Sequence, residues 1–298
     1  MKNFKLTWLH VLAAAIVVVW GTTFISTKVL LQAGLAPESI FFYRFLVAYA
    51  GIWFFGKSPL FAKNLKDELT FALLGISGGS AYFLTENYAL KVTQVSNVSL
   101  LVCTAPLITA LLSHVFLEGE KLHRRLVQGL LLALVGVSLV VFNGHFILQL
   151  HPLGDLLSIA AALCWAIYTI VLKRVGERYS TLLITRKVFF YGVITILPVM
   201  LTHSPTAEWQ ALQSPLVLAN LAFLAVAASL LCYFFWNLVV KRLGAVRSTN
   251  YIYFVPLVTL AASFLFLSEV ITALALLGAA LVLLGVFWAE RKNAKIQL

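Results

Sequence analysis

The sequence predicts an all-α polytopic membrane protein whose ten transmembrane helices form two inverted five-helix repeats. Three observations carry this prediction. Apolar runs of about 18 residues or more recur along the whole chain. Lys and Arg gather in alternate connections between these runs, and one apolar motif occurs twice, half a chain apart.

Composition excludes several other classes of protein. The 298 residues are 61% hydrophobic and 11% charged, which is more apolar surface than one soluble core can bury. The alternating segments of about 10 residues that are typical of a membrane β-barrel do not occur. The net charge of +11 does not indicate nucleic-acid binding, because the basic residues lie in short connections beside apolar runs.

Patterns that would hold a metal or a cofactor are also missing. Cys103, Cys164 and Cys232 lie inside apolar runs without metal or redox spacing, so we interpret them as small core-filling residues. No His-Glu-x-x-His, Ser/His/Asp or ATP-binding motif is found. We therefore expect no metal and no cofactor, and an enzyme is not the first hypothesis.

Ten spans are expected from the apolar runs. The first begins at Trp8, and it is too long for a signal peptide and lacks a cleavage site. At 1.5 Å per residue, about 20 residues cross a hydrocarbon core of roughly 30 Å. The spans lie near 8–30, 37–56, 69–90, 96–117, 125–143, 153–172, 182–202, 216–240, 248–267 and 271–289.

The basic residues predict the orientation. With the N-terminus inside, all but three of the 22 Lys and Arg residues fall on the inner side, the exceptions being Lys28, Arg44 and Lys91. This bias predicts a multi-pass protein of the inner (plasma) membrane with both termini in the cytoplasm.

The repeat can be followed across each half. Pro106–Leu117 matches Pro256–Leu267, and Gly129 and Gly136 match Gly278 and Gly285. Trp20 through Lys28 likewise corresponds to Trp165 through Lys173. Because five spans are an odd number, the second half must enter the membrane inverted, an arrangement typical of transporters. We predict repeats at 1–148 and 149–298.

Several of these motifs resemble a known family. Trp20-Gly21-Thr22-Thr23-Phe24, Arg44 and Tyr88-Ala89-Leu90 are similar to the drug/metabolite transporter superfamily, as are the two proline spans with acidic ends. The chain particularly resembles its ten-helix EamA-type exporters, over nearly its whole length. The resemblance implies an inner-membrane carrier that moves amino acids, metabolites or drugs through a central cavity, usually outward. One departure is that Glu118 and Glu120 bracket the place of the family's single Glu.

Arg44 and Glu86 are the main candidates for function. Ionisable residues inside spans are costly and are therefore functional candidates by default. Arg44 lies seven residues into the second span, and Glu86 lies four residues before the outer end of the third, so their depths are compatible. One interpretation is an ion pair that neutralises both charges. The other places Arg44 on the cavity, where it attracts a substrate carboxylate or phosphate, with Glu86 balancing the charge or carrying a proton.

Aromatic residues with polar neighbours indicate an amphipathic cavity. Trp20 and Thr23 share one helical face, and their counterpart in the second half is the pair Trp165 and Tyr168. The alternative for these side chains is helix packing. The other expected substrate-binding residues are Tyr82, Trp236, Asn250 and Tyr253.

Prolines and acids supply candidates for hinges and gates. Pro106 and Pro256 lie about ten residues into the fourth and ninth spans, where each is expected to bend its helix, as a static kink or as a flexing point. Glu120 and Glu269 end these spans, as solvated groups or as gate residues. The paired glycines allow close helix packing.

These features predict a secondary transporter of small metabolites, with amino acids and related amphiphilic compounds favoured and export the favoured direction. Alternating access through a cavity between the two repeats is the expected mechanism. The alternatives are an intramembrane enzyme, such as a protease or lipid-linked transferase, and a non-transporting scaffold. The expected partners are a small-molecule substrate and the lipid bilayer, with no nucleic acid, and a homodimer is left open.

Overall fold

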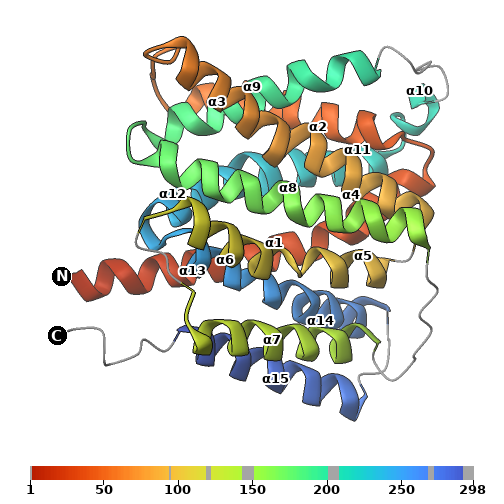
Figure 1. Cartoon of the computed structure of the whole chain (residues 1–298). Helices are drawn as coiled ribbons and strands as arrows, with labels where there is room; N and C mark the ends of the chain where they lie inside the picture. The colour runs from red at the N-terminus through yellow and green to blue at the C-terminus, as the bar shows by residue number, and fades with distance from the viewer. Residues whose placement is uncertain are drawn as a thin grey trace.

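The computed structural model describes residues 2–93, 95–118, 122–142, 151–200, 208–267 and 272–290, and its regular structure there is entirely helical (Figure 1). Within these ranges, seven helices are long and apolar enough to cross a membrane. They are Thr7–Gln32, Pro37–Phe55, Val98–Phe116, Arg124–Val141, Pro152–Gly176, Thr181–Met200 and Pro215–Leu243. The prediction of an all-α multi-pass membrane protein is confirmed.

The helices follow one another through short connections. The first half of the chain contains α1 (Lys2–Gln32), α2 (Pro37–Ile52), the 3-10 helix η1 (Trp53–Phe55), α3 (Leu65–Gly75), the π-helix η2 (Ile76–Ser80), α4 (Ala81–Val92), α5 (Val95–Val102), α6 (Ala105–Phe116) and α7 (Arg124–Phe142). The second half contains α8 (Pro152–Gly176), α9 (Thr181–Met200), α10 (Glu208–Ala211), α11 (Pro215–Ala222), the π-helix η4 (Phe223–Leu231), α12 (Cys232–Leu243), α13 (Ala245–Thr249), the 3-10 helix η5 (Asn250–Phe254), α14 (Val255–Leu267) and α15 (Ala273–Glu290).

Local chemistry explains where several helices begin. Pro37, Pro152 and Pro215 stand in first turns, where a missing N–H breaks no helical hydrogen bond. Asn64 caps α3, because its Oδ1 accepts the backbone N–H of Asp67 at 2.8 Å. Gly244 has φ +95°, a left-handed conformation that turns the chain between α12 and α13.

The expected bends at Pro106 and Pro256 take a different form. Helix α5 ends at Val102, and α6 starts afresh at Ala105 with Pro106 in its first turn. Pro256 likewise stands in the first turn of α14, directly after the 3-10 helix η5. Each proline thus opens a new helix rather than bending a continuous one, because the first turn is where proline fits without strain. The two interruptions meet, since Cys103 Sγ lies 3.7 Å from the carbonyl oxygen of Ile252.

Helices α7 and α15 pack tightly along one side of the bundle (Figure 1). A Cβ placed on Gly129 would lie 2.5 Å from Gly285 O, and one on Gly136 would lie 2.6 Å from Gly278 O. The earlier glycine of α7 thus contacts the later glycine of α15, and the later contacts the earlier, so the two helices run antiparallel. The predicted close helix approach at the four glycines is confirmed.

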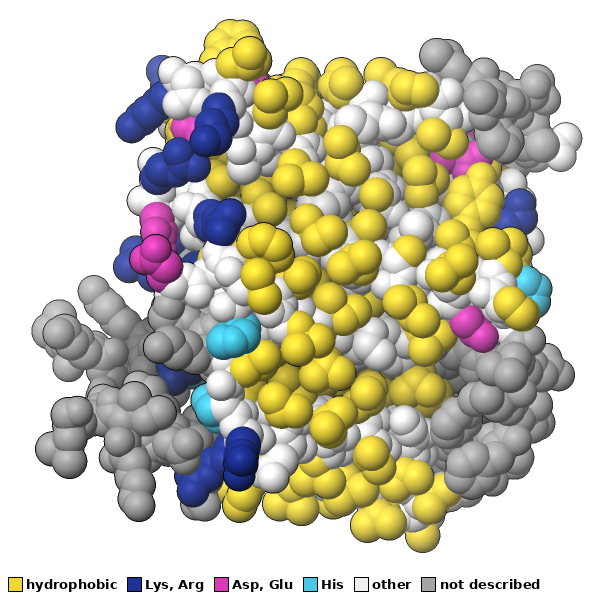
Figure 2. Space-filling model, in the orientation of Figure 1, with side chains coloured by type: hydrophobic (Ala, Val, Ile, Leu, Met, Phe, Trp, Pro, Cys, Tyr) yellow, Lys and Arg dark blue, Asp and Glu magenta, His cyan; other side chains and the backbone are white. Residues whose placement is uncertain are grey.

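The surface divides into an apolar belt and two ends. Helix α1 begins and α15 ends at the same end of the bundle (Figure 1). In Figure 2, Lys and Arg side chains gather at that end, and hydrophobic side chains cover the flank between the ends. We call the end where α1 begins the basic end and the other the opposite end. An exposed apolar belt of this kind is what a lipid environment requires.

Candidate functional site

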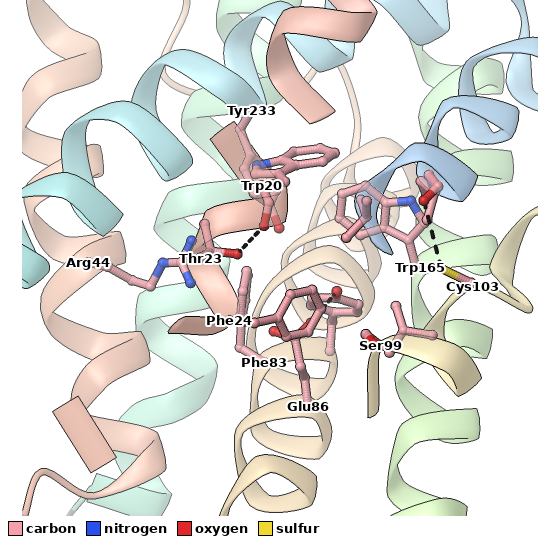
Figure 3. Close-up of a pocket in the computed structure, with 14 residues that line it drawn as sticks. Trp20, Thr23, Phe24, Arg44, Phe83, Glu86, Ser99, Cys103, Trp165 and Tyr233 are labelled. Carbon is pink, nitrogen blue, oxygen red and sulfur yellow. Dashed lines mark hydrogen bonds between the residues drawn. The ribbon is translucent and has the colours of Figure 1, made fainter. Parts of the chain in front are cut away.

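A small cavity lies in the middle of the bundle, where the interrupted helices meet (Figure 3). Its volume is about 50 Å³, well below the roughly 300–1,000 Å³ of ligand pockets. Both halves of the chain contribute to its wall. The lining residues are Trp20, Thr23, Phe24, Arg44, Tyr82, Phe83, Glu86, Ser99, Val102, Cys103, Trp165, Tyr233, Ile252 and Val255.

Arg44 brings a buried cation to this cavity. Its side chain extends from α2 and is 3% exposed. Nε donates a hydrogen bond to Ser229 Oγ at 2.8 Å, and the guanidinium carbon lies 4.3 Å from the ring centroid of Phe83. In the described part of the chain, no carboxylate forms a salt bridge with Arg44. Among the described residues, its direct contacts are thus a hydroxyl and an aromatic face, while the Glu86 carboxylate lies near enough to interact with it electrostatically.

Glu86 stands on the wall of the same cavity. It is buried, and its Oε1 accepts a hydrogen bond from the Tyr82 hydroxyl at 2.6 Å, four residues earlier on α4. The structure thus places Arg44 and Glu86 around one space but gives each a separate partner. A direct ion pair, one of the two interpretations drawn from the sequence, is not formed.

Aromatic rings supply most of the remaining wall. Trp20 and Trp165 meet edge to face at 5.2 Å between ring centroids, joining the two halves. Thr23 Oγ1 donates to the carbonyl oxygen of Trp20 at 2.7 Å. Trp165 Nε1 is buried and has no hydrogen-bond partner among the described residues. An unpaired buried indole N–H is uncommon and is a donor that a ligand oxygen could satisfy.

Six of the ten expected binding residues therefore line this cavity, namely Trp20, Thr23, Arg44, Tyr82, Glu86 and Trp165. The other four are not among the lining residues. Trp236 packs against Trp20, with ring centroids 4.9 Å apart. Tyr168 donates a hydrogen bond to Asn237. Tyr253 donates to the Leu130 carbonyl oxygen on α7 at 3.2 Å. Asn250 is buried in η5.

The two acids expected as gate residues, Glu120 and Glu269, lie outside the described residues. The nearby Glu118 is described and is exposed. Lys28, near the end of α1, donates to the Leu90 carbonyl oxygen at 2.8 Å. It thereby satisfies a free carbonyl in the last turn of α4.

Sequence reasoning did not assign eight of the fourteen lining residues, among them Tyr233 and Phe83, and it also missed Ser229, which bonds to Arg44. Tyr233 lines the cavity and donates to the Gly78 carbonyl oxygen at 2.7 Å. Ser229 holds Arg44, and Phe83 packs under its guanidinium. Ser229 could have been identified from the sequence, because it is a polar residue inside a long apolar run and its hydroxyl needs a hydrogen-bond partner there.

A second polar group that the sequence analysis missed joins the two halves at the basic end. The Arg178 Nη1 atom lies 2.8 Å from Asp67 Oδ1, and the Tyr179 hydroxyl donates to Asp67 Oδ2 at 2.7 Å. Lys187 forms a salt bridge with Glu68. We call these five residues the basic-end network. The sequence signal was an adjacent pair of acids within a connection that otherwise carries only basic charges.

The Tyr179 hydrogen bond holds the pKa of Asp67 below its usual value of 3.8. The positive charge of Arg178 and hydrogen bonds from Asn64 and Arg178 act in the same direction, while burial opposes them. Asp67 is therefore a stable anion in the first turn of α3, just before the third predicted span at 69–90.

The fold and this cavity define a class, a polytopic helical membrane protein whose two halves enclose a polar, aromatic site. Comparisons with known proteins identify the family within this class. Residues 7–142 and 152–290 match the EamA-like transporter family, and the chain belongs to that family. One solved structure, 18% identical, superposes with a TM-score of 0.73 over 95% of this chain and 96% of that one, so the fold is shared.

Relatives match almost from end to end. A probable amino-acid metabolite efflux pump of Escherichia coli is 29% identical and covers 93% of each chain. A probable terminal-alkyne amino-acid exporter of Streptantibioticus cattleyicolor is 29% identical, covering 98% of this chain and 96% of its own. An uncharacterized transporter of Archaeoglobus fulgidus is also 29% identical, over 95% and 98%. The family and these names indicate a transporter rather than an enzyme.

Proposed function

We propose that this protein is a secondary transporter of small amphiphilic metabolites, with amino acids or related anions favoured and export the favoured direction. The observation that carries the proposal is Arg44, a buried cation that lines the cavity and forms no direct salt bridge with a carboxylate in the described chain. A buried charge without a directly bonded counter-ion is costly. A substrate carboxylate would offset that cost on binding.

The rest of the wall suits the remainder of such a substrate. Trp20, Trp165 and Tyr233 offer apolar and aromatic contact area, while Glu86 offers a negative group for an amine. The indole N–H of Trp165 is a donor for a further oxygen. The names of two relatives, a probable terminal-alkyne amino-acid exporter and a probable amino-acid metabolite efflux pump, agree with this chemistry.

The cavity must enlarge to accept even a small metabolite, because about 50 Å³ holds little more than a water molecule or two. Its wall joins helices of both halves, so a relative movement of the halves changes its size. This geometry favours alternating access, in which binding and release accompany the rocking of one half against the other.

Packing between the helices supports ten spans in two inverted repeats, 1–148 and 149–298. With the 150-residue offset, α9 is the counterpart of α2, and α11 with η4 is the counterpart of α3. The contact of α3 with α9 in one arrangement therefore corresponds to the contact of α2 with η4 and α11 in the other, and both are observed. The same correspondence converts α4–α8 into α1–α12, and α6–α8 into α1–α14. The pairs α2–α9 and α7–α15 map onto themselves. A twofold relation between the halves accounts for all of these contacts.

In the proposed orientation, the protein lies in the inner (plasma) membrane and its basic end faces the cytoplasm. Glu86 and Ser99 then belong to the outer half of the bundle, near the ends of α4 and α5. The basic-end network closes the cytoplasmic side by joining the halves. On this proposal, the structure corresponds to a state that is closed toward the cytoplasm.

Uptake into proteoliposomes tests the proposal. Purified protein would be assayed with a panel of radiolabelled amino acids and other small metabolites, with and without a pH gradient. Saturable uptake of at least one amphiphilic anion is expected. Arg44→Ala should lower this uptake by about a hundredfold or more, because the counter-charge is lost, whereas Arg242→Ala, on an exposed basic residue outside the cavity, should not. Equal uptake by Arg44→Ala and the parent would overturn the assignment.

The same assay addresses energy coupling. Uptake driven by a pH gradient in the parent, but not in Glu86→Gln, would identify Glu86 as the proton carrier. Uptake that ignores the gradient would identify facilitated flow.

A further inference from the structure

We propose that a groove between α3 and α8 at the basic end binds the headgroup of an anionic phospholipid. The groove has a volume of about 420 Å³. It is separate from the central cavity, and the two share no lining residue. Its walls are Asn64, Lys66, Asp67, Thr70 and Leu73 from α3 and its cap, and Val171, Arg174, Val175 and Arg178 from α8 and the residues after it.

The charges in the groove favour an anion. Lys66, Arg174 and Arg178 are exposed cations, whereas Asp67 is the one carboxylate in this lining. Asp67 already pairs with Arg178 and accepts the Tyr179 hydroxyl. Lys66 and Arg174 therefore leave a positive excess. A phosphate with three accessible oxygens can bridge side chains on two helices in this way.

Polarity changes along the groove as it does along a phospholipid. Lys66, Thr70 and Leu73 recur on one face of α3, and Val171 and Arg174 share a face of α8, with Arg178 just after the end of that helix at Gly176. Lys66 is seven residues, or roughly 10 Å at the helical rise, from Leu73 along α3. The groove thus passes from cations at the basic end to the exposed Leu73 and the part-buried Val171 in the apolar belt.

This gradient distinguishes a lipid from a free phosphate ion. Free phosphate needs only the cations, whereas a diacyl lipid also uses the apolar continuation toward the membrane interior. The Arg174 guanidinium, which lines the groove, donates to the Phe116 carbonyl oxygen and lies 5.9 Å from the centroid of the Phe116 ring. The proposal requires that the helices span a membrane and does not depend on which substrate is carried.

Native mass spectrometry of the full-length protein tests the site. The probes are phosphatidylglycerol, phosphatidylcholine with the same acyl chains, and inorganic phosphate. We expect phosphatidylglycerol to bind at least tenfold more tightly than phosphatidylcholine, and millimolar phosphate not to displace it. Lys66→Ala/Arg174→Ala should abolish this preference. The matched pair Lys57→Ala/Lys63→Ala removes the same charge from exposed basic residues outside the groove and should preserve it.

The outcomes separate this proposal from the transport assignment. Equal preference for phosphatidylglycerol in the two double variants would overturn the groove, whatever the uptake assay gives. Displacement by inorganic phosphate would show an ion site rather than a lipid site. In the parent protein, raising the salt concentration from 0.05 to 0.5 M should weaken phosphatidylglycerol binding several-fold, since the contacts are exposed charges. Binding that is insensitive to salt would also overturn the proposal.

Discussion

The two ends of the bundle are joined across the halves in different ways. At the basic end, two acids of the first half form salt bridges with Arg178 and Lys187 of the second. At the opposite end, the described residues form no salt bridge, and hydrogen bonds cross the halves instead, from the Ala36 N–H to Glu208 Oε1 at 3.0 Å and from the Ser39 hydroxyl to Met200 Sδ at 3.8 Å. Charge pairing between the halves is thus concentrated at one end.

This difference breaks the symmetry of the repeat. With the 150-residue offset that relates Pro106 to Pro256, Asp67 and Glu68 correspond to Val217 and Leu218. Both α3 and α11 begin at equivalent positions, Leu65 and Pro215, so the substitution of acids by apolar residues is not a shift in register. If the two repeats exchange shapes during transport, these salt bridges are formed in only one of the two end states. On the proposed mechanism, the basic-end network therefore favours the state that is closed at the basic end.

Removing Glu68 should have the largest effect on this preference. The Lys187 side chain is 5% exposed and that of Glu68 is 19% exposed, so Glu68→Ala leaves a nearly buried cation unpaired. We expect the basic end to open roughly tenfold to a hundredfold more often. The measure is the labelling rate of a cysteine placed at Thr185, a fully buried residue of α9 that hydrogen bonds to Asn237, in a background without Cys103, Cys164 and Cys232.

A paired substitution serves as the control for Glu68. Glu68→Met combined with Lys187→Met replaces both charges by apolar groups of similar length, which is often neutral for a buried pair. Labelling at position 185 should return close to the parent rate. Equal, fast labelling in the single and the double variant would show that the ion pair does not hold this end closed.

Arg178→Ala should have a smaller effect in the same direction. The Arg178 side chain is 56% exposed, so solvent screens its pairing with Asp67, and Asp67 keeps its bond from Tyr179. We expect labelling at position 185 to rise about two- to fivefold. Arg242→Ala, on an exposed arginine outside the network, is the matched control. A larger rise than that caused by Glu68→Ala would reverse the order of importance assigned to the two pairs.

The contrast between the ends also shows what could be predicted from the sequence. Apolar periodicity and basic connections located the helices because burial in lipid imposes both patterns on the chain. Gly129, Gly136 and their counterparts were predictable because only glycine permits such close backbone contact. These features depend on local sequence.

Side-chain pairing was harder to predict because it depends on tertiary contacts between distant residues. Arg44 and Glu86 were recognisable as buried charges, but the partner of Arg44, Ser229, lies 185 residues away on a π-helix. Asp67 and Glu68 looked like ordinary charges of a connection, and their partners come from the other half. Pro106 was expected to bend a helix, since sequence alone does not reveal that α5 already ends at Val102.

Breaking a contact at the opposite end should have a smaller effect. Glu208→Ala removes the acceptor of the Ala36 N–H, a hydrogen bond that is present in the state closed at the basic end. Its loss slightly destabilises that state, so labelling at position 185 should rise by no more than about twofold. A rise comparable to that of Glu68→Ala would show that charge pairing at the basic end is not the dominant contact between the halves.

The smallest expected effect is that of pH on the Asp67 contacts. Because the folded pKa of Asp67 lies below its usual 3.8, the stability that this carboxylate contributes is fully present above 3.8 and is lost only as the pH falls through the lower folded value. Burial and the hydrogen bond to Asp67 raise the pKa of the neighbouring Tyr179 above its usual 10.0, so its hydroxyl keeps the proton that it donates. Labelling at position 185, normalised to a free cysteine peptide, should stay constant over that range. An increase toward pH 5 would mean that another titrating group holds the basic end closed.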